Sequence, residues 1–119
     1  MKGAQGTDGG AIFIEDGSTL SISDSYFERN MASVSGGAIY ASYSDSIKIL
    51  NCEFIMNKAL SLGSHIYIAY VNIADEVRIE NSKFKQQSIM NNALYFKRSK
   101  ANLQNLALYP PEKRVLDSI

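Results

Sequence analysis

The stretch Gly9-Gly10-Ala11-Ile12-Phe13 recurs 27 residues later as Gly36-Gly37-Ala38-Ile39-Tyr40. A third copy, Gly63-Ser64-His65-Ile66-Tyr67, follows after another 27 residues, and a weaker one, Asn91-Asn92-Ala93-Leu94-Tyr95, after 28 more. A fixed period of this length is typical of proteins built from stacked structural repeats. We therefore expect the chain to fold as a series of similar units.

A second block repeats in phase with the first. It reads Ile22-Ser23-Asp24-Ser25-Tyr26-Phe27, then Ile49-Leu50-Asn51-Cys52-Glu53-Phe54, then Ile79-Glu80-Asn81-Ser82-Lys83-Phe84, with a decayed copy at Leu103-Gln104-Asn105-Leu106-Ala107-Leu108. Apolar residues alternate within each copy, as where Ile47 and Ile49 flank Lys48. Alternation indicates half-buried strands, and the Gly, Ser, Asp and Asn residues between the strands form turns.

Two architectures could use such repeats: a meander of antiparallel hairpins, or a coil in which each strand lies on its own copy in the next repeat. Only the coil explains why like residues recur at the same phase. It places Phe27, Phe54 and Phe84, followed by Leu108, at one level, and Asp24, Asn51, Asn81 and Asn105 at one turn. We expect these stacked Asn side chains to hydrogen-bond along the axis and so to satisfy amides that the interior would otherwise penalise. We predict an all-β parallel β-helix with about 3.5–4 coils of 27–30 residues and three short strands per coil.

The repeats divide the chain into three parts. Residues 1–8 form a lead-in, residues 9–108 form the β-helix with coils 9–35, 36–62, 63–90 and 91–108, and residues 109–119 form an exit segment or partial cap that begins near Pro110-Pro111. The simplest interpretation is a piece of a longer β-helix. Bare strand edges at its two ends would favour end-to-end self-association.

The paired motif resembles a known family. Gly-Gly-Ala-Ile at 9–12 and 36–39, followed by Phe-x-x-Asn at 27–30 and 54–57, is similar to the polymorphic outer-membrane protein repeat of chlamydial type. Similar repeats occur in right-handed β-helices of the pectin-lyase-like superfamily. The resemblance covers residues 9 to about 108, although the third copy has Ser64-His65 for Gly-Ala and Gln87 for Asn. It implies a right-handed coil, an extracellular or cell-surface location and adhesin character.

Composition narrows the function classes. The chain has 119 residues, with 12 basic and 12 acidic side chains, so it offers no basic field for nucleic acid or an anionic membrane. No apolar run is long enough for a membrane span, and a single cysteine excludes an internal disulfide. Met1–Asp8 lacks the apolar core of a signal peptide, so for a secreted protein we expect the signal upstream.

The alternation also predicts which side chains face solvent. We expect one inward set at Ile12, Ile39, Ile66 and Leu94, and a second two positions on at Ile14, Ala41, Ile68 and Phe96. The column Ala11, Ala38, His65 and Ala93 would then face solvent, together with an aromatic stripe of Phe13, Tyr40, Tyr67 and Tyr95. The stripe could bind sugar rings or an apolar peptide edge, it could stabilise neighbouring strands, or in the opposite register it could fill the core.

Few residues of the chain are candidates for catalysis or metal binding. The carboxylates, Asp8, Glu15, Asp16, Asp24, Glu28, Asp45 and Glu53, form no cluster in this arrangement, so we predict no catalytic residues. His65, the single histidine, suggests a structural role rather than a metal site, and Cys52 suggests a small buried thiol. The third copy has three extra residues within 69–76, and we expect them to form a surface loop, which we interpret as a neutral insertion rather than a functional loop. We expect no cofactor and no metal.

These patterns favour a non-enzymatic module of a larger surface or secreted protein. It would act as a rigid scaffold or adhesive surface towards an unidentified protein or glycan. The alternative is a carbohydrate-binding or carbohydrate-processing fragment of the pectin-lyase-like kind, either a polysaccharide lyase or a glycoside hydrolase.

Overall fold

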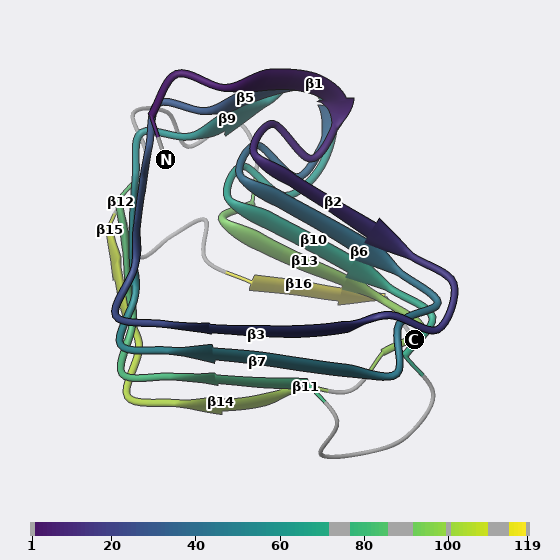
Figure 1. Ribbon diagram of the computed structural model, residues 1–119. Helices are drawn as coiled ribbons and strands as arrows, with labels where there is room; N and C mark the ends of the chain where they lie inside the picture. The colour runs from purple at the N-terminus through teal and green to yellow at the C-terminus, as the bar shows by residue number, and fades with distance from the viewer. Residues whose placement is uncertain (1, 72–76, 86–91, 100, 110–114, 119) are drawn as a thin grey trace.

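The computed structural model describes residues 2–71, 77–85, 92–99, 101–109 and 115–118. These residues form strands, turns and bends, with no helix among them, and therefore no helix that could cross a membrane. The chain winds in successive coils, so that each strand lies beside the strand one coil later rather than beside its neighbour in sequence (Figure 1). Every strand pair is parallel. This confirms the predicted parallel solenoid.

The strands form four sheets, each named here by its first strand. The β2 sheet contains β2 (Ile12–Glu15), β6 (Ile39–Ser42), β10 (Ile66–Ala69), β13 (Leu94–Lys97) and β16 (Val115–Ser118). The β3 sheet contains β3 (Thr19–Ser23), β7 (Ser46–Leu50), β11 (Val77–Glu80) and β14 (Asn102–Gln104). The β4 sheet contains β4 (Tyr26–Glu28), β8 (Glu53–Ile55), β12 (Lys83–Lys85) and β15 (Ala107–Tyr109). The β1 sheet contains β1 (Gln5–Asp8), β5 (Met31–Ser35) and β9 (Lys58–Ala59).

The β1 sheet is the main difference from the predicted three strands per coil. Its strands are poor in large apolar residues, and β9 has only two residues, so alternation did not reveal them. Ala32 and Ala59 are the fully buried side chains that tie this sheet to the interior. β1 lies within the predicted lead-in, yet it pairs with β5 and extends the solenoid. At the other end, β16 of the predicted exit segment pairs with β13.

Left-handed backbone conformations turn the chain at the corners of each coil. Asp24, Asn51, Asn81 and Asn105 all have φ between 51° and 54° in the turn between the β3 and β4 sheets. Asn and Asp tolerate this conformation better than other residues with a side chain. A second corner, after the β2 sheet, contains Asp16, Tyr43, Tyr70 and Arg98, with φ between 49° and 60°. The same turn is thus repeated from coil to coil.

Columns of like residues fill the core. Phe27, Phe54 and Phe84 are paired across β4, β8 and β12, with successive ring centroids 4.9 Å apart and the rings nearly parallel. Leu108 continues the same column. The first inward set is buried as predicted except at the end of the stack, where Ile12 is partly exposed. The core therefore consists of in-register ladders that run along the solenoid axis.

The prediction that the column Ala11, Ala38, His65 and Ala93 faces solvent is wrong. Ala38, His65 and Ala93 are buried, with at most 3% of their surface exposed. The reason is a local irregularity at the start of each strand, where two consecutive N–H groups donate to one carbonyl. Thus Ala11 and Ile12 both bond to the Ala38 oxygen, and Ala38 and Ile39 both bond to the His65 oxygen. Such a bulge interrupts the alternation of sides.

We predict that Gly37→Ala strongly destabilises the fold, because a Cβ at this position would lie 2.1 Å from the Ser64 oxygen and 2.7 Å from the Lys58 backbone. We expect the free energy of unfolding to fall by roughly 2–4 kcal/mol in urea titration. Gly17→Ala is the matched control, since Gly17 has φ +77° but nothing within 4 Å of the added atom. It should cost only about 1 kcal/mol for its backbone conformation. Equal losses in the two variants would contradict the close packing of successive coils.

Candidate functional site

The aromatic stripe is a continuous stack on the outer side of the β2 sheet. Phe13, Tyr40, Tyr67 and Tyr95 are register partners, and their successive ring centroids lie 5.2, 5.0 and 5.2 Å apart with interplanar angles of 4°, 1° and 7°. The rings follow one another in this order because the four-residue strands pair without a register shift. The structure thus brings all four residues together.

Exposure falls steeply along this stack. Phe13 is 50% exposed, whereas Tyr67 and Tyr95 are each only 9% exposed. Each inner ring has a neighbour on both faces, and Tyr67 and Tyr95 also pack in a small apolar cluster with Ala69 to which Leu62 and Tyr70 contribute. The prediction of an external stripe therefore needs correction, because two of its four residues, Tyr67 and Tyr95, are buried. A free ring face remains at Phe13, the end of the stack.

This geometry limits what the stripe can bind. A sugar ring that packs on an aromatic residue needs an open ring face. Tyr40 and Tyr67 each have a stacked ring on both faces, and Tyr95, which stacks on Tyr67, is only 9% exposed, so none of the three presents an open face. Burial, together with the neighbouring Tyr40 hydroxyl, raises the pKa of Tyr67 to about 12, so its hydroxyl stays neutral at physiological pH. The stack is a stabilising element with one accessible end.

The ladder Asp24, Asn51, Asn81 and Asn105 lies at a turn, but on the outside of the solenoid. All four residues are exposed, and their shared feature is the left-handed backbone rather than a buried amide chain. One side-chain bond along the axis is present, in which Asn105 Nδ2 donates to Asn81 Oδ1 at 2.7 Å. The expectation that this column satisfies amides in the interior is therefore wrong.

The buried amide ladder is formed instead by Asn30 and Asn57, the final residues of the two Phe-x-x-Asn motifs. The backbone N–H and Nδ2 of Asn30 both donate to Asn57 Oδ1, at 2.9 and 3.0 Å. Asn57 Nδ2 donates to the Phe27 carbonyl oxygen and contacts His65 Nδ1 at 3.1 Å. Sequence reasoning missed this network, although the spacing of three residues after each ladder phenylalanine could have revealed it.

His65 ends this amide ladder inside the core. Because Asn57 Nδ2 is the donor, His65 Nδ1 accepts and the ring proton lies on Nε2. Nε2 has no hydrogen-bond partner among the described residues, and the ring lies beside Phe54 and Phe84 with centroids 6.1 and 5.7 Å away. Complete burial lowers the pKa of His65 from 6.5 to about 3. The imidazole is therefore neutral and structural at physiological pH.

Cys52 is buried, as the sequence suggested. Its Sγ lies 3.3 Å from the Leu50 carbonyl oxygen, and its backbone N–H donates to Ser82 Oγ in the next coil. Burial raises the pKa of the Cys52 thiol, and hydrogen bonding to the backbone opposes this shift only partly. A neutral, enclosed thiol is a poor nucleophile, so Cys52 fills space at a corner of the coil.

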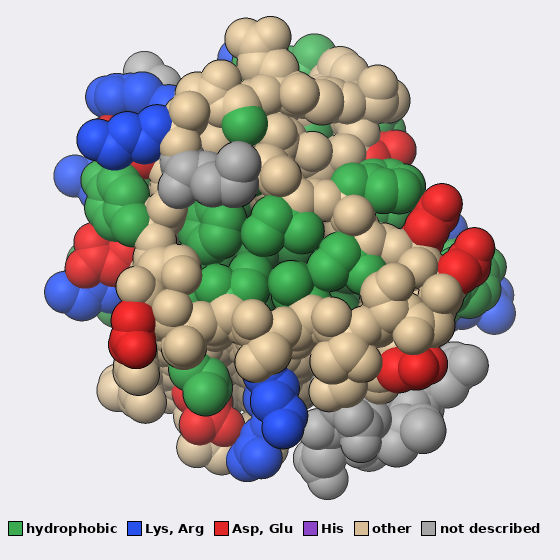
Figure 2. Space-filling view, in the orientation of Figure 1, with side chains coloured by type: hydrophobic (Ala, Val, Ile, Leu, Met, Phe, Trp, Pro, Cys, Tyr) green, Lys and Arg blue, Asp and Glu red, His purple; other side chains and the backbone are tan. Residues whose placement is uncertain are grey.

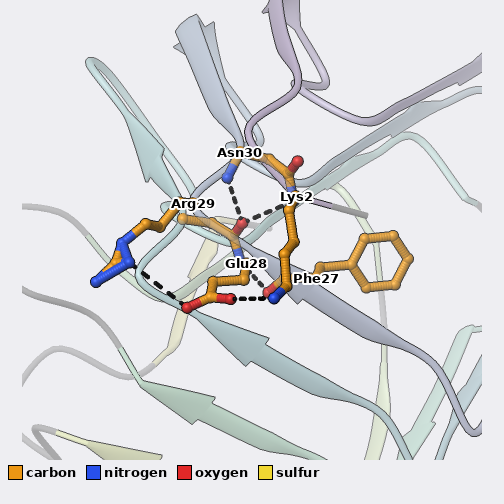
Figure 3. Close-up of polar contacts among 6 residues, drawn as sticks. Lys2, Phe27, Glu28, Arg29 and Asn30 are labelled. Atoms are coloured by element: carbon orange, nitrogen blue, oxygen red, sulfur yellow. Dashed lines mark hydrogen bonds and ion pairs between the residues drawn. The ribbon is translucent and has the colours of Figure 1, made fainter.

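Carboxylates of the first coil are dispersed or paired with cations. Glu28 lies 3.3 Å from Lys2 Nζ and 3.5 Å from Arg29 Nη1, while the neighbouring Phe27 ring points away from this ion pair (Figure 3). In the column of Glu15 the later coils supply Ser42, Ala69 and Lys97. No group of three or more His, Cys, Asp or Glu residues that could hold a metal occurs in the described part of the chain.

The predicted insertion at 69–76 falls mostly outside the described residues. Its first three residues are described: Ala69 ends β10, Tyr70 occupies a corner, and Val71 is buried with its N–H donating to Ser99 Oγ. Residues 72–76 lie outside the described part of the chain, so the surface loop stays a prediction there.

The fold and its ladders define a parallel β-solenoid, and comparison with known proteins agrees. The family model for the right-handed β-helix region matches residues 3–106, which is most of the chain. The chain belongs to the right-handed β-helix family. A search of curated proteins and a search of solved structures each found no match.

Buried His65 makes stability depend on pH. The unfolded chain takes up a proton below pH 6.5, whereas the folded chain does so only near pH 3, so stability falls as the pH is lowered through this window. We expect a loss of roughly 2 kcal/mol between pH 7 and pH 5 in urea titrations. His65→Ala, which restores the residue of the neighbouring coils, should remove most of this slope. An unchanged slope in that variant would contradict a buried neutral imidazole.

Proposed function

We propose that this chain is a non-enzymatic, rigid module of a larger surface or secreted protein, in which it acts as a scaffold. The observation that carries this proposal is the pair of aromatic stacks. Phe27, Phe54 and Phe84 stack inside the solenoid, and the aromatic stripe stacks outside it. Bending the axis would open ring contacts and backbone hydrogen bonds together. A body that resists bending suits a spacer.

The outer surface also carries exposed aromatic side chains that could make adhesive contacts with a partner. Tyr43 is 56% exposed and stacks on Tyr70 with ring centroids 4.6 Å apart, and Lys97 Nζ lies 5.6 Å from the Tyr70 ring. Phe13, at the end of the aromatic stripe on β2, is 50% exposed. Aromatic residues are enriched in protein contact surfaces relative to the rest of a protein's surface. A protein surface is therefore the favoured partner.

Carbohydrate binding is the second candidate, and the free ring face of Phe13 is the observation that favours it. A single open face would suit the terminal sugar of a glycan better than a long chain, because the remaining faces of the stripe are covered. The sequence resemblance to polymorphic outer-membrane protein repeats and pectin-lyase-like proteins supports an extracellular or cell-surface location. Location and partner remain part of the proposal.

The scaffold role predicts mechanical resistance. When the 119-residue chain is pulled by its ends within a polyprotein, we expect a distinct force peak followed by release of about 0.35 nm for each unfolded residue. Tyr67→Ala should lower the peak, because it removes a ring that stacks on two neighbours. Lys48→Ala, on the exposed face of β7, is the control and should leave the peak unchanged. Extension without a peak would contradict the scaffold role.

Glycan binding and turnover separate the two candidates. On an array of immobilised glycans, the scaffold proposal expects no signal from the chain, whereas the second candidate expects a signal that Phe13→Ala abolishes and Lys48→Ala preserves. Incubation with polygalacturonate should release no product under the proposal. Turnover that scales with the concentration of the chain would show an enzyme and overturn the proposed function.

A further inference from the structure

Charge is separated along this chain although the net charge is zero. Residues 1–30 contain five acidic and two basic side chains, whereas residues 83–119 contain seven basic and two acidic ones. Because the solenoid advances coil by coil, this separation in sequence becomes a separation along the axis. One end of the molecule is acidic and the other is basic.

Two columns show this separation most clearly. In the β2 sheet, Glu15 of the first coil and Lys97 of the fourth share a column through Ser42 and Ala69. At the adjoining corner, Asp16 begins and Arg98 ends the column of left-handed residues that also contains Tyr43 and Tyr70. The corner column thus carries opposite charges at its first and last described members, whereas in the β2 sheet Lys97 lies one strand in from the edge, beside Ser118 of β16.

The acidic end is also open and apolar. β1, β2, β3 and β4 each stand at the edge of their sheet in the described part of the chain, and at β4 a parallel bridge joins Glu28 to Lys2. Ile12, Ile14 and Ile22 are partly exposed here, whereas their partners one coil later are fully buried. Figure 2 shows hydrophobic side chains gathered between β2 and β3, with acidic and some basic side chains at the margin of this face. The face combines the free edges of β1, β2 and β3 with apolar surface and an excess of negative charge.

We propose that a second copy of this chain covers the acidic end with the basic end of its own solenoid, in a head-to-tail contact. Such a contact repeats the parallel stacking that already joins each coil to the next, at the usual strand separation of about 4.8 Å. An incoming β2 would meet the free edge of β16, which places Lys97 and Arg98 two strand spacings, about 10 Å, from Glu15 and Asp16 of the other copy. Charges at this separation still attract at low ionic strength.

A head-to-tail contact has two consequences. The contact surfaces differ from one another, so each added copy leaves a new acidic or basic end free and the assembly grows instead of closing as a dimer. Since attraction between the charged ends guides the encounter, salt should weaken association. Both properties distinguish this contact from a symmetric contact between lateral faces.

The test is a charge swap followed by sedimentation velocity. Asp16→Arg places a basic side chain at the corner of the acidic end, and Arg98→Asp places an acidic side chain at the equivalent corner of the basic end. In each variant this corner then carries the same charge at both ends of the solenoid. The left-handed backbone should accept both substitutions, because Asp16 (φ 53°) and Arg98 (φ 49°) already adopt this conformation at equivalent positions. Lys48→Glu is the control for altered net charge, since Lys48 lies on β7, which has a strand on each side. Circular dichroism checks that each variant is folded.

For the unaltered 119-residue chain we expect the mean mass to rise with concentration at low salt and to fall on addition of 0.5 M NaCl, roughly the range in which such charges are screened. Each swap variant alone should associate about tenfold more weakly, the two mixed should regain association, and Lys48→Glu should match the unaltered chain. A chain that stays monomeric at every concentration would overturn the proposal. So would association that both swaps leave intact, or a mixture that does not recover.

Discussion

Hydrogen bonding between each strand and the equivalent strand one coil later is the interaction on which the rest of the structure depends. The register sets equivalent residues 27 positions apart from Ile39 to Ile66 and from Phe27 to Phe54, and 30 positions apart from Phe54 to Phe84, where the coil is longer. A parallel pair without a shift places like residues over one another. A side chain that packs well on its own copy therefore stabilises the fold more when it is repeated in the next coil. This explains why the sequence is periodic.

The columns differ in what they contribute. Stacked phenylalanines fill the interior, left-handed Asp and Asn residues turn the chain at its outer corner, and a short amide ladder satisfies buried polar groups. His65 is the departure from this repetition, because it stands where other coils have alanine and meets the end of the amide ladder. A solenoid can accept one such exception because the coils on either side hold the backbone in place.

Much of this arrangement could be predicted from the sequence, because the period identifies register partners directly. The pairs Phe54 with Phe84 and Tyr40 with Tyr67 follow from counting residues. The burial of Ala38 and His65 could not be predicted by simple alternation, since a shared carbonyl acceptor turns two successive side chains inward. Nor could the fourth sheet, whose strands Met31–Ser35 and Lys58–Ala59 lack an apolar pattern. The exposure of the aromatic stripe depends on which ring faces are covered, and position in the sequence alone does not determine that.

The central claim is that equivalent strands of successive coils pair in parallel and in register. Nuclear Overhauser effects in an isotopically labelled sample test it most directly. The account predicts backbone contacts from residues 39–42 to residues 66–69, and ring contacts from Phe54 to both Phe27 and Phe84. Backbone contacts that instead join strands adjacent in sequence, such as β2 with β3, in antiparallel order would contradict it.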